Sequence, residues 1–154
     1  MITRTTPADT ERENQVAETV ARQYGWDFQR TGYYDNYDLM FMREGRLVGI
    51  GEIKNRNHEH NRYDSVFLSA HKWLTLVTAS QGLGVPGLFI VSFTDQIRTK
   101  YVSDIDASAH QIAGRSDRPD APNDQELIIH VPVGSMEYVY DGSGPSANEF
   151  ERGW

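Results

Sequence analysis

The chain contains no cysteine among its 154 residues. This absence excludes disulfide bonds, zinc sites built on thiolates, and iron–sulfur clusters. The reducing environment of a cytoplasm is compatible with such a composition, and we expect a cytoplasmic protein.

The chain also lacks a long apolar run. No stretch approaches the roughly 20 apolar residues that a membrane-spanning helix needs. The N-terminus shows neither the basic nor the apolar segment of a signal peptide. We therefore expect no membrane association.

Basic residues are outnumbered, with 15 Lys and Arg against 22 Asp and Glu and a formal net charge of −7. This balance disfavours a protein that coats nucleic acid nonspecifically, because such binding depends on many cationic contacts with phosphates. It does not exclude an enzyme that acts on nucleic acid, since acids that bind metal ions contribute to the total without facing the substrate.

The length predicts one domain with room for a hydrophobic core. We assign residues 1–140 to this domain. Residues 141–154 are rich in Gly, Ser, Asn and Glu, and we expect them to form a flexible C-terminal tail.

Residues 37–42 and 47–54 are two apolar runs of strand length, separated by a short polar connection that contains Gly45. This pattern predicts a β-hairpin. Side chains alternate along a strand, so Glu52 and Lys54 share one face, which also carries Val48 and Ile50. A strand apolar on both faces is buried on both faces. An acid and an amine at its end are costly unless they are paired or bind something, which indicates a functional site.

The register of the hairpin decides where Asp38 lies. A three-residue loop places Asp38 directly opposite Glu52, with Cβ atoms about 4.5–5.5 Å apart. Two carboxylates at that distance repel unless a divalent cation lies between them. A two-residue loop instead pairs Asp38 with Gly51 and turns it to the other face, unless a bulge intervenes.

Asp38 followed by Glu52-Ile53-Lys54 resembles the core motif of the PD-(D/E)XK nuclease superfamily, which has an acid on one strand and Glu-x-Lys on the next. Tyr37 stands where the motif name has Pro. A Glu-x-Lys triplet alone arises by chance in many chains, but the apolar strand context and the upstream Asp38 favour the resemblance.

The resemblance covers about residues 8–102 and implies an α/β fold with a restriction-endonuclease-like core. In such a core a mixed central sheet is flanked by helices in the order αβββαβ, followed here by C-terminal strands. The implied function is a Mg²⁺- or Mn²⁺-dependent nuclease that hydrolyses DNA, of the stand-alone phage type or like a Holliday junction resolvase. A phage-encoded enzyme would act in the host cytoplasm. A resolvase would need a homodimer, and the rival interpretation is a non-cleaving nucleic-acid-binding or structural module.

The resemblance also implies roles for the motif residues. Asp38 and Glu52 would bind the metal ion together with the main-chain carbonyl of Ile53. Lys54 would orient the attacking water or stabilise the transition state.

A further acid comes from a helix predicted to run from Pro7-Ala8-Asp9 to Tyr24, with Gly25 as its stop. Glu13 lies on the same stripe as the apolar residues 16, 17 and 20. It matches the helix glutamate of many superfamily members, which would hold a second ion. The alternative is a first-turn acid that complements the helix dipole.

Basic residues follow the motif and are candidate contacts with nucleic acid: Arg56, His58, His60, Arg62 and Lys72. The alternative for the first four is a solvated loop, and for Lys72 a solvated lysine. A zinc site at His58 and His60 lacks further ligands. The aromatic residues Tyr33, Tyr34 and Tyr37 are candidates for base stacking or for packing at the core.

The remaining pattern completes an α/β core. Ser69 is expected to cap a helix that ends at Ser80 before Gly82, with an apolar stripe of Ala70, Trp73, Leu74 and Val77. Strands are predicted over 88–93, 97–102 and 127–133, the last at a sheet edge because of Pro132. The segment 115–120 between them shows no periodicity.

Overall fold

The computed structural model describes residues 7–31, 37–108, 110–114 and 125–140. The predicted tail, the irregular segment 115–120, Tyr33 and Tyr34 lie outside these ranges. The described elements are α1 (Pro7–Tyr24), β1 (Asp27–Arg30), β2 (Leu39–Arg43), β3 (Arg46–Asn55), β4 (Ser65–Ser69), α2 (Ala70–Leu83), β5 (Gly87–Ser92), β6 (Ile97–Tyr101), β7 (His110–Gly114), β8 (Gln125–Pro132) and β9 (Glu137–Val139), with short 3₁₀ turns at Val102–Asp104 and Val133–Ser135.

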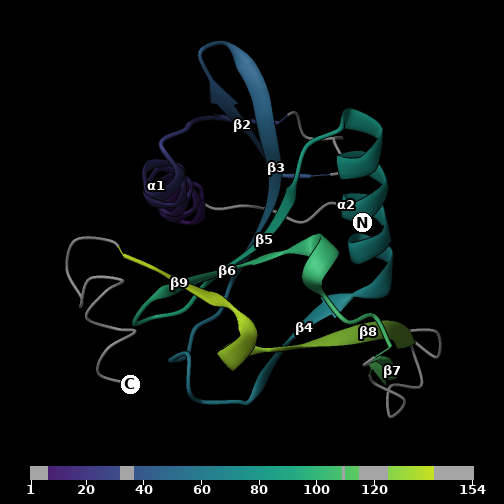
Figure 1. Ribbon diagram of the computed structural model, residues 1–154. Coiled ribbons are helices and arrows are strands. Elements are labelled where there is room, and N and C mark those ends of the chain that lie inside the picture. The colour runs from purple at the N-terminus through teal and green to yellow at the C-terminus, as the bar shows by residue number, and fades with distance from the viewer. Residues whose placement is uncertain (1–6, 32–36, 109, 115–124, 141–154) are drawn as a thin grey trace.

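The central sheet has the strand order β1-β2-β3-β5-β6-β9. Strands β3 and β5 are parallel, and all other neighbours in this sheet are antiparallel. Two parallel neighbours need a crossover connection, which β4 and α2 provide. Helix α1 covers one face of the sheet and α2 lies on the other (Figure 1). The predicted mixed sheet flanked by helices is confirmed.

Strand β5 defines the two faces because its six residues are all buried. Leu88 and Ile90 pack with α1, on what we call the α1 face, whereas Phe89 and Val91 pack with α2, on the α2 face. The neighbouring β3 is aligned so that Ile53 pairs with Ile90 on the α1 face. Glu52 pairs with Phe89 and Lys54 with Val91 on the α2 face. The predicted common face of Glu52 and Lys54 follows from this register.

A second, antiparallel sheet of order β4-β8-β7 lies beside α2 and contributes to the core on the α2 face (Figure 1). Strand β8 pairs with both β4 and β7 and is therefore central. The prediction of an edge strand was wrong. Pro132 is the last residue of β8, so its missing N–H does not interrupt the ladder between the strands.

The hairpin turn is shorter than the three-residue loop that would bring the acids together. Arg43 pairs with Arg46, so the turn consists of Glu44 and Gly45, whose φ angles of 52° and 76° are both positive, as in a type I′ turn. A bulge then corrects the register, because Val48 is an extra residue between the pairs Met42↔Leu47 and Phe41↔Gly49.

The bulge has two consequences. Leu39 pairs with Gly51, which places Asp38 next to Glu52 on the α2 face, as in the bulged alternative. Val48 itself packs with the α1 cluster. Its predicted place on the face of Glu52 was wrong, since the prediction assumed unbroken alternation.

Both helices begin or end at predicted residues, with one correction. Gly25 ends α1 with φ of 72°, and the Ser69 Oγ accepts a hydrogen bond from the Lys72 N–H at 3.1 Å at the start of α2. Helix α2 continues past Gly82 to Leu83, and Gly84 ends it with φ of 69°.

The apolar stripe of α2 also differs in one member. Leu76 is fully buried, whereas Leu74 is 56% exposed. The stripe is therefore centred on Trp73, Leu76 and Val77, which all pack in the core on the α2 face. Leu74 lies outside it.

Candidate active site

The Asp38 side chain is held against β3 next to Glu52. The Asp38 N–H donates to the Gly51 carbonyl at 2.9 Å. The Asp38 Oδ2 accepts a hydrogen bond from the Ile53 N–H, also at 2.9 Å. These two bonds flank Glu52 in the sequence, so backbone geometry fixes one carboxylate beside the other.

Glu52 is the most constrained acid of the site, with 8% of its surface exposed. Its Oε1 lies 3.1 Å from the Lys72 Nζ. Its Oε2 is buried and has no hydrogen-bond partner among the described residues. Burial, and then the negative charge of Asp38, raise the pKa of Glu52 to about 7. A buried, unsatisfied acceptor beside a second carboxylate fits a divalent cation with oxygen ligands.

The described residues contain no group of three or more His, Cys, Asp and Glu side chains placed to share a metal ion. The site therefore offers two carboxylates, and further ligands would be main-chain oxygens or water. Mg²⁺ is commonly bound in this way, through one or two carboxylates with several waters retained. The alternative of zinc at His58 and His60 finds no support among these residues.

Lys54 lies two residues beyond Glu52, on the same face and half-buried. Burial lowers the pKa of the Lys54 ammonium, and the positive charge of Arg56 lowers it further. This cation lies near Glu52 at the end of a buried strand. It has the chemistry needed to hold a water or a phosphate oxygen.

Glu13 has the predicted helix phase but a different partner. It is half-buried, whereas Glu11 and Glu18 are exposed. Its Oε1 accepts a hydrogen bond from the Arg30 Nη2 at 3.2 Å. Helix α1 packs on the face opposite Glu52, and the structure does not bring Glu13 into contact with the Asp38 and Glu52 pair. Its role as a metal ligand stays a prediction.

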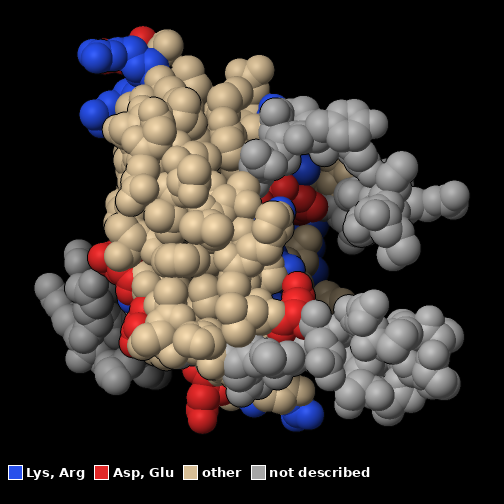
Figure 2. All heavy atoms as spheres, turned by 90° about the vertical axis from the view of Figure 1, so that its right-hand side faces the viewer, with Lys and Arg blue, Asp and Glu red and all other residues tan. Residues whose placement is uncertain are grey.

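The candidate nucleic-acid contacts divide into two groups. Lys72 belongs to the site, because it pairs with Glu52 across the gap between α2 and β3. Arg56, His58, His60 and Arg62 lie in the segment that follows β3. Within it, His60 is tied to Asp95 by its N–H at 2.9 Å and by its ring at 2.5 Å. Figure 2 shows acidic and basic side chains side by side along one edge of the molecule, while most of the face that carries α2 is uncharged.

Two contacts that support the site were not foreseen. The Arg12 guanidinium, on α1, donates to the Ser92 carbonyl at 3.1 Å and to the Asn57 Oδ1 at 3.2 Å. It thus ties the helix to the end of β5 and to the segment that follows β3. Lys72 was predicted near a phosphate but not as the partner of Glu52. Its place in the first turn after the Ser69 cap was readable from the sequence, but that pairing was not.

These features define a class of protein. Asp38 lies directly before β2, and Glu52 and Lys54 lie on the antiparallel neighbour β3. The mixed sheet that carries these residues lies between two helices. This is a nuclease of the PD-(D/E)XK type. A family model described as "Phage putative PDDEXK endonuclease" matches residues 3–139, and the chain belongs to that family.

Solved structures are similar to the chain as well. The Holliday junction resolvase Hjc from Archaeoglobus fulgidus, an archaeal hyperthermophile, is 18% identical, with a TM-score of 0.49 over 80% of this chain and 87% of that one. No curated protein matches the sequence. Among the described residues, no helix is both long and apolar enough to cross a membrane.

Proposed function

We propose that the protein is a divalent-metal-dependent nuclease that hydrolyses phosphodiester bonds in DNA, acting in the host cytoplasm during replication, recombination or degradation of DNA. One observation carries the proposal. The Glu52 carboxylate is buried, lies beside Asp38, and has an oxygen without a hydrogen-bond partner among the described residues. Such an arrangement is unfavourable in a protein that binds no cation.

Asp38, Glu52 and the main-chain carbonyl of Ile53 would hold Mg²⁺ or Mn²⁺. Such an ion lowers the pKa of a bound water and neutralises charge on the phosphate. Lys54 would orient the attacking water and stabilise negative charge at the phosphate. Lys72, which pairs with Glu52 in the absence of an ion, would be released when the ion binds and would then contact the substrate.

The DNA backbone would lie along the segment after β3, contacted by Arg56, His58, His60 and Arg62. The charge of −7 means that this contact is local and does not extend over the whole surface. Symmetric cleavage of a four-way junction requires two active sites, so that activity would require a homodimer.

The direct test incubates the full chain with single-stranded, duplex and four-way-junction DNA in Mg²⁺, in Mn²⁺ or in EDTA. We expect cleavage with either ion and none in EDTA. Cleavage of RNA substrates with the same sequences tests whether the protein is specific for DNA. Metal-dependent binding without cleavage of any substrate would instead establish the rival, a non-cleaving binding module.

Glu13→Gln tests whether the helix acid acts at the metal site. We expect cleavage to fall about tenfold or somewhat more, because an outer ligand lies at or below the lower end of the usual range of about 10²–10⁴ for a positioned catalytic group. Initial rates at saturating Mg²⁺ measure this. Glu18→Gln is the matched control, since Glu18 pairs with Arg22 on the exposed side of the same helix.

A second variant separates the ligand role from the observed ion pair. Arg30→Gln removes the partner of Glu13 and leaves its carboxylate in place. If Glu13 acts only through Arg30, both variants lose the same activity and the same stability. Full activity of Glu13→Gln would show that Glu13 has no role at the metal site.

A further inference from the structure

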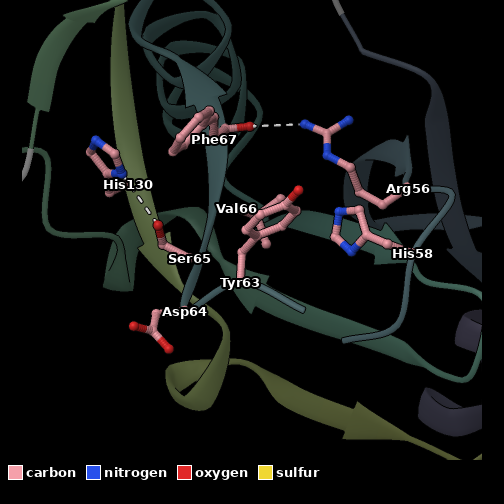
Figure 3. Close-up of a pocket in the computed structure, with 8 residues that line it drawn as sticks. All are labelled: Arg56, His58, Tyr63, Asp64, Ser65, Val66, Phe67 and His130. Atoms are coloured by element: carbon pink, nitrogen blue, oxygen red, sulfur yellow. Dashed lines mark hydrogen bonds between the residues drawn. The ribbon is translucent and has the colours of Figure 1, made fainter. Parts of the chain in front are cut away.

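A pocket of about 600 Å³ lies beside the candidate active site. Its volume is within the usual range of about 300–1,000 Å³ for small-molecule sites. In Figure 3, Phe67 and His130 lie on one side, Arg56 and His58 on the other, and Tyr63 between them. These residues come from three segments: the stretch after β3, strand β4 and strand β8.

The pocket continues from the catalytic strand. Arg56 is two residues beyond Lys54, directly after the end of β3, and its side chain lines the pocket. The Arg56 main chain is fixed by its N–H, which donates to the Ser92 carbonyl at 2.9 Å. Its guanidinium reaches across to the Phe67 carbonyl at 3.4 Å. Arg56 therefore connects the end of the catalytic strand to the lining of the pocket.

Two residues of the pocket lining, Phe67 and Tyr63, have exposed aromatic rings that a bound molecule could contact. Phe67 is 46% exposed and Tyr63 is 56% exposed, whereas large apolar side chains are normally placed in the core. Phe67 alternates with the buried Val66 and Leu68, so it projects from the outer face of β4. Each exposed ring meets a histidine edge to face: Phe67 meets His130 at 4.7 Å between centroids, and Tyr63 meets His58 at 5.0 Å.

The chemistry of the lining selects one kind of occupant. Flat aromatic rings next to an arginine are the groups on which nucleobases stack. The arginine offsets the single acid of the lining, Asp64, and the two histidine rings can donate hydrogen bonds to the oxygens of a phosphate backbone. A base inside a duplex must first be unpaired and unstacked, which costs free energy, so the pocket favours a base that is already unpaired.

We infer that this pocket binds one unpaired nucleobase of the strand whose phosphate lies at Asp38, Glu52 and Lys54. The substrate is then DNA with unpaired nucleotides next to the cleaved bond, such as a single strand, a flap or an open junction. This inference rests on the proposed nuclease function and narrows its substrate class.

The test measures binding of the full chain in EDTA, where cleavage does not interfere. The probes are a fluorescent oligothymidylate of about a dozen nucleotides, within the usual site sizes for single strands, and a duplex of equal length. We expect Phe67→Ala to weaken binding of the single strand about tenfold or more, with duplex binding unchanged, because loss of base stacking has effects of this size. Phe67→Tyr should restore it, since it keeps the ring.

Leu74→Ala is the matched control, because it shortens an apolar side chain on α2 that is exposed to a similar degree and lies outside the pocket lining. Tyr63→Ala is a second pocket variant. Circular dichroism of each variant verifies the fold, which an exposed side chain on β4 should barely affect.

An abasic scan locates the base. When bases are removed one at a time, the wild type should bind more weakly to the oligonucleotide that lacks the base at one position. The affinity of Phe67→Ala should not change when the base at that position is removed. Unchanged single-strand affinity of Phe67→Ala, or equal losses for single strand and duplex, would overturn the inference.

The two proposals fail separately. If the wild type cleaves DNA with metal but Phe67→Ala binds and cleaves a flap normally, only the base pocket is wrong. If no substrate is cleaved but the single-strand effect is present, the pocket stands and the nuclease function fails.

Discussion

Glu52→Gln should abolish metal-dependent cleavage and at the same time make the metal-free protein more stable at neutral and alkaline pH. The amide can still accept the hydrogen bond from Lys72, so the side chain keeps its place. It cannot supply the negative charge that a divalent ion requires. Glu52 is thus predicted to favour function at the expense of stability.

The pH dependence follows from the pKa of Glu52. Burial, and then Asp38, raise it in the folded protein from the ordinary 4.5 to about 7. Between these values the folded state binds more protons than the unfolded state, so the free energy of unfolding decreases as pH rises. The loss is as much as about 3 kcal/mol above pH 7, since one pKa unit corresponds to about 1.4 kcal/mol.

Urea denaturation in EDTA across this pH range checks the prediction, with cleavage assayed in parallel. Glu52→Gln should lack this decrease in stability. The control Glu18→Gln should retain both the decrease and the activity, because Glu18 is exposed. Mg²⁺ should then stabilise the wild type but not Glu52→Gln, because a ligand that binds only the folded state raises its stability. Cleavage by Glu52→Gln would refute the assignment of the site.

Lys54→Ala should lower the turnover rate by about 10²–10⁴, the range for a positioned catalytic group. Mn²⁺ affinity should not fall, since the ammonium acts on water or phosphate and its loss removes a positive charge near the ion. Stopped assays at saturating DNA measure turnover, and calorimetry measures Mn²⁺ affinity. Lys100→Ala is a control, because the Lys100 ammonium bonds the Ser135 carbonyl instead.

The activity of the wild type should also decline at high pH before an ordinary lysine would lose its proton. Burial and Arg56 lower the pKa of Lys54 from 10.5, and the charged form exists only below that pKa. Lost Mn²⁺ binding with unchanged turnover in Lys54→Ala would reverse its assigned role.

Local patterns were sufficient for the elements that carry the motif. The alternation of β3 placed Glu52 and Lys54 on one face, and helical spacing turned Glu13 inward, because both periods are properties of the backbone itself. Short-range chemistry was also enough for the Ser69 cap and the Gly25 stop. Strand β1, with only four residues, lacked any such signal, and it forms because β2 offers it an antiparallel partner.

The register of the hairpin was only partly predictable from the sequence. The sequence allowed two solutions, and the structure combined a two-residue turn with a bulge at Val48. The turn is local, but the position of the bulge depends on which side chains the packed sheet can bury. Helix α2 likewise ends at Gly84 and not at Gly82, because Gly84 adopts the left-handed conformation, with φ of 69°, that closes a helix.

Pairing between distant segments was decided by the tertiary structure alone. Lys72 meets Glu52, Arg30 meets Glu13, and Phe67 joins Arg56 and His130 around one pocket. Each of these contacts depends on how α2, β1 and the second sheet pack against the central sheet. Sequence periodicity specifies which face a residue occupies, but the neighbour across that face is set by the packing of elements far apart in the chain.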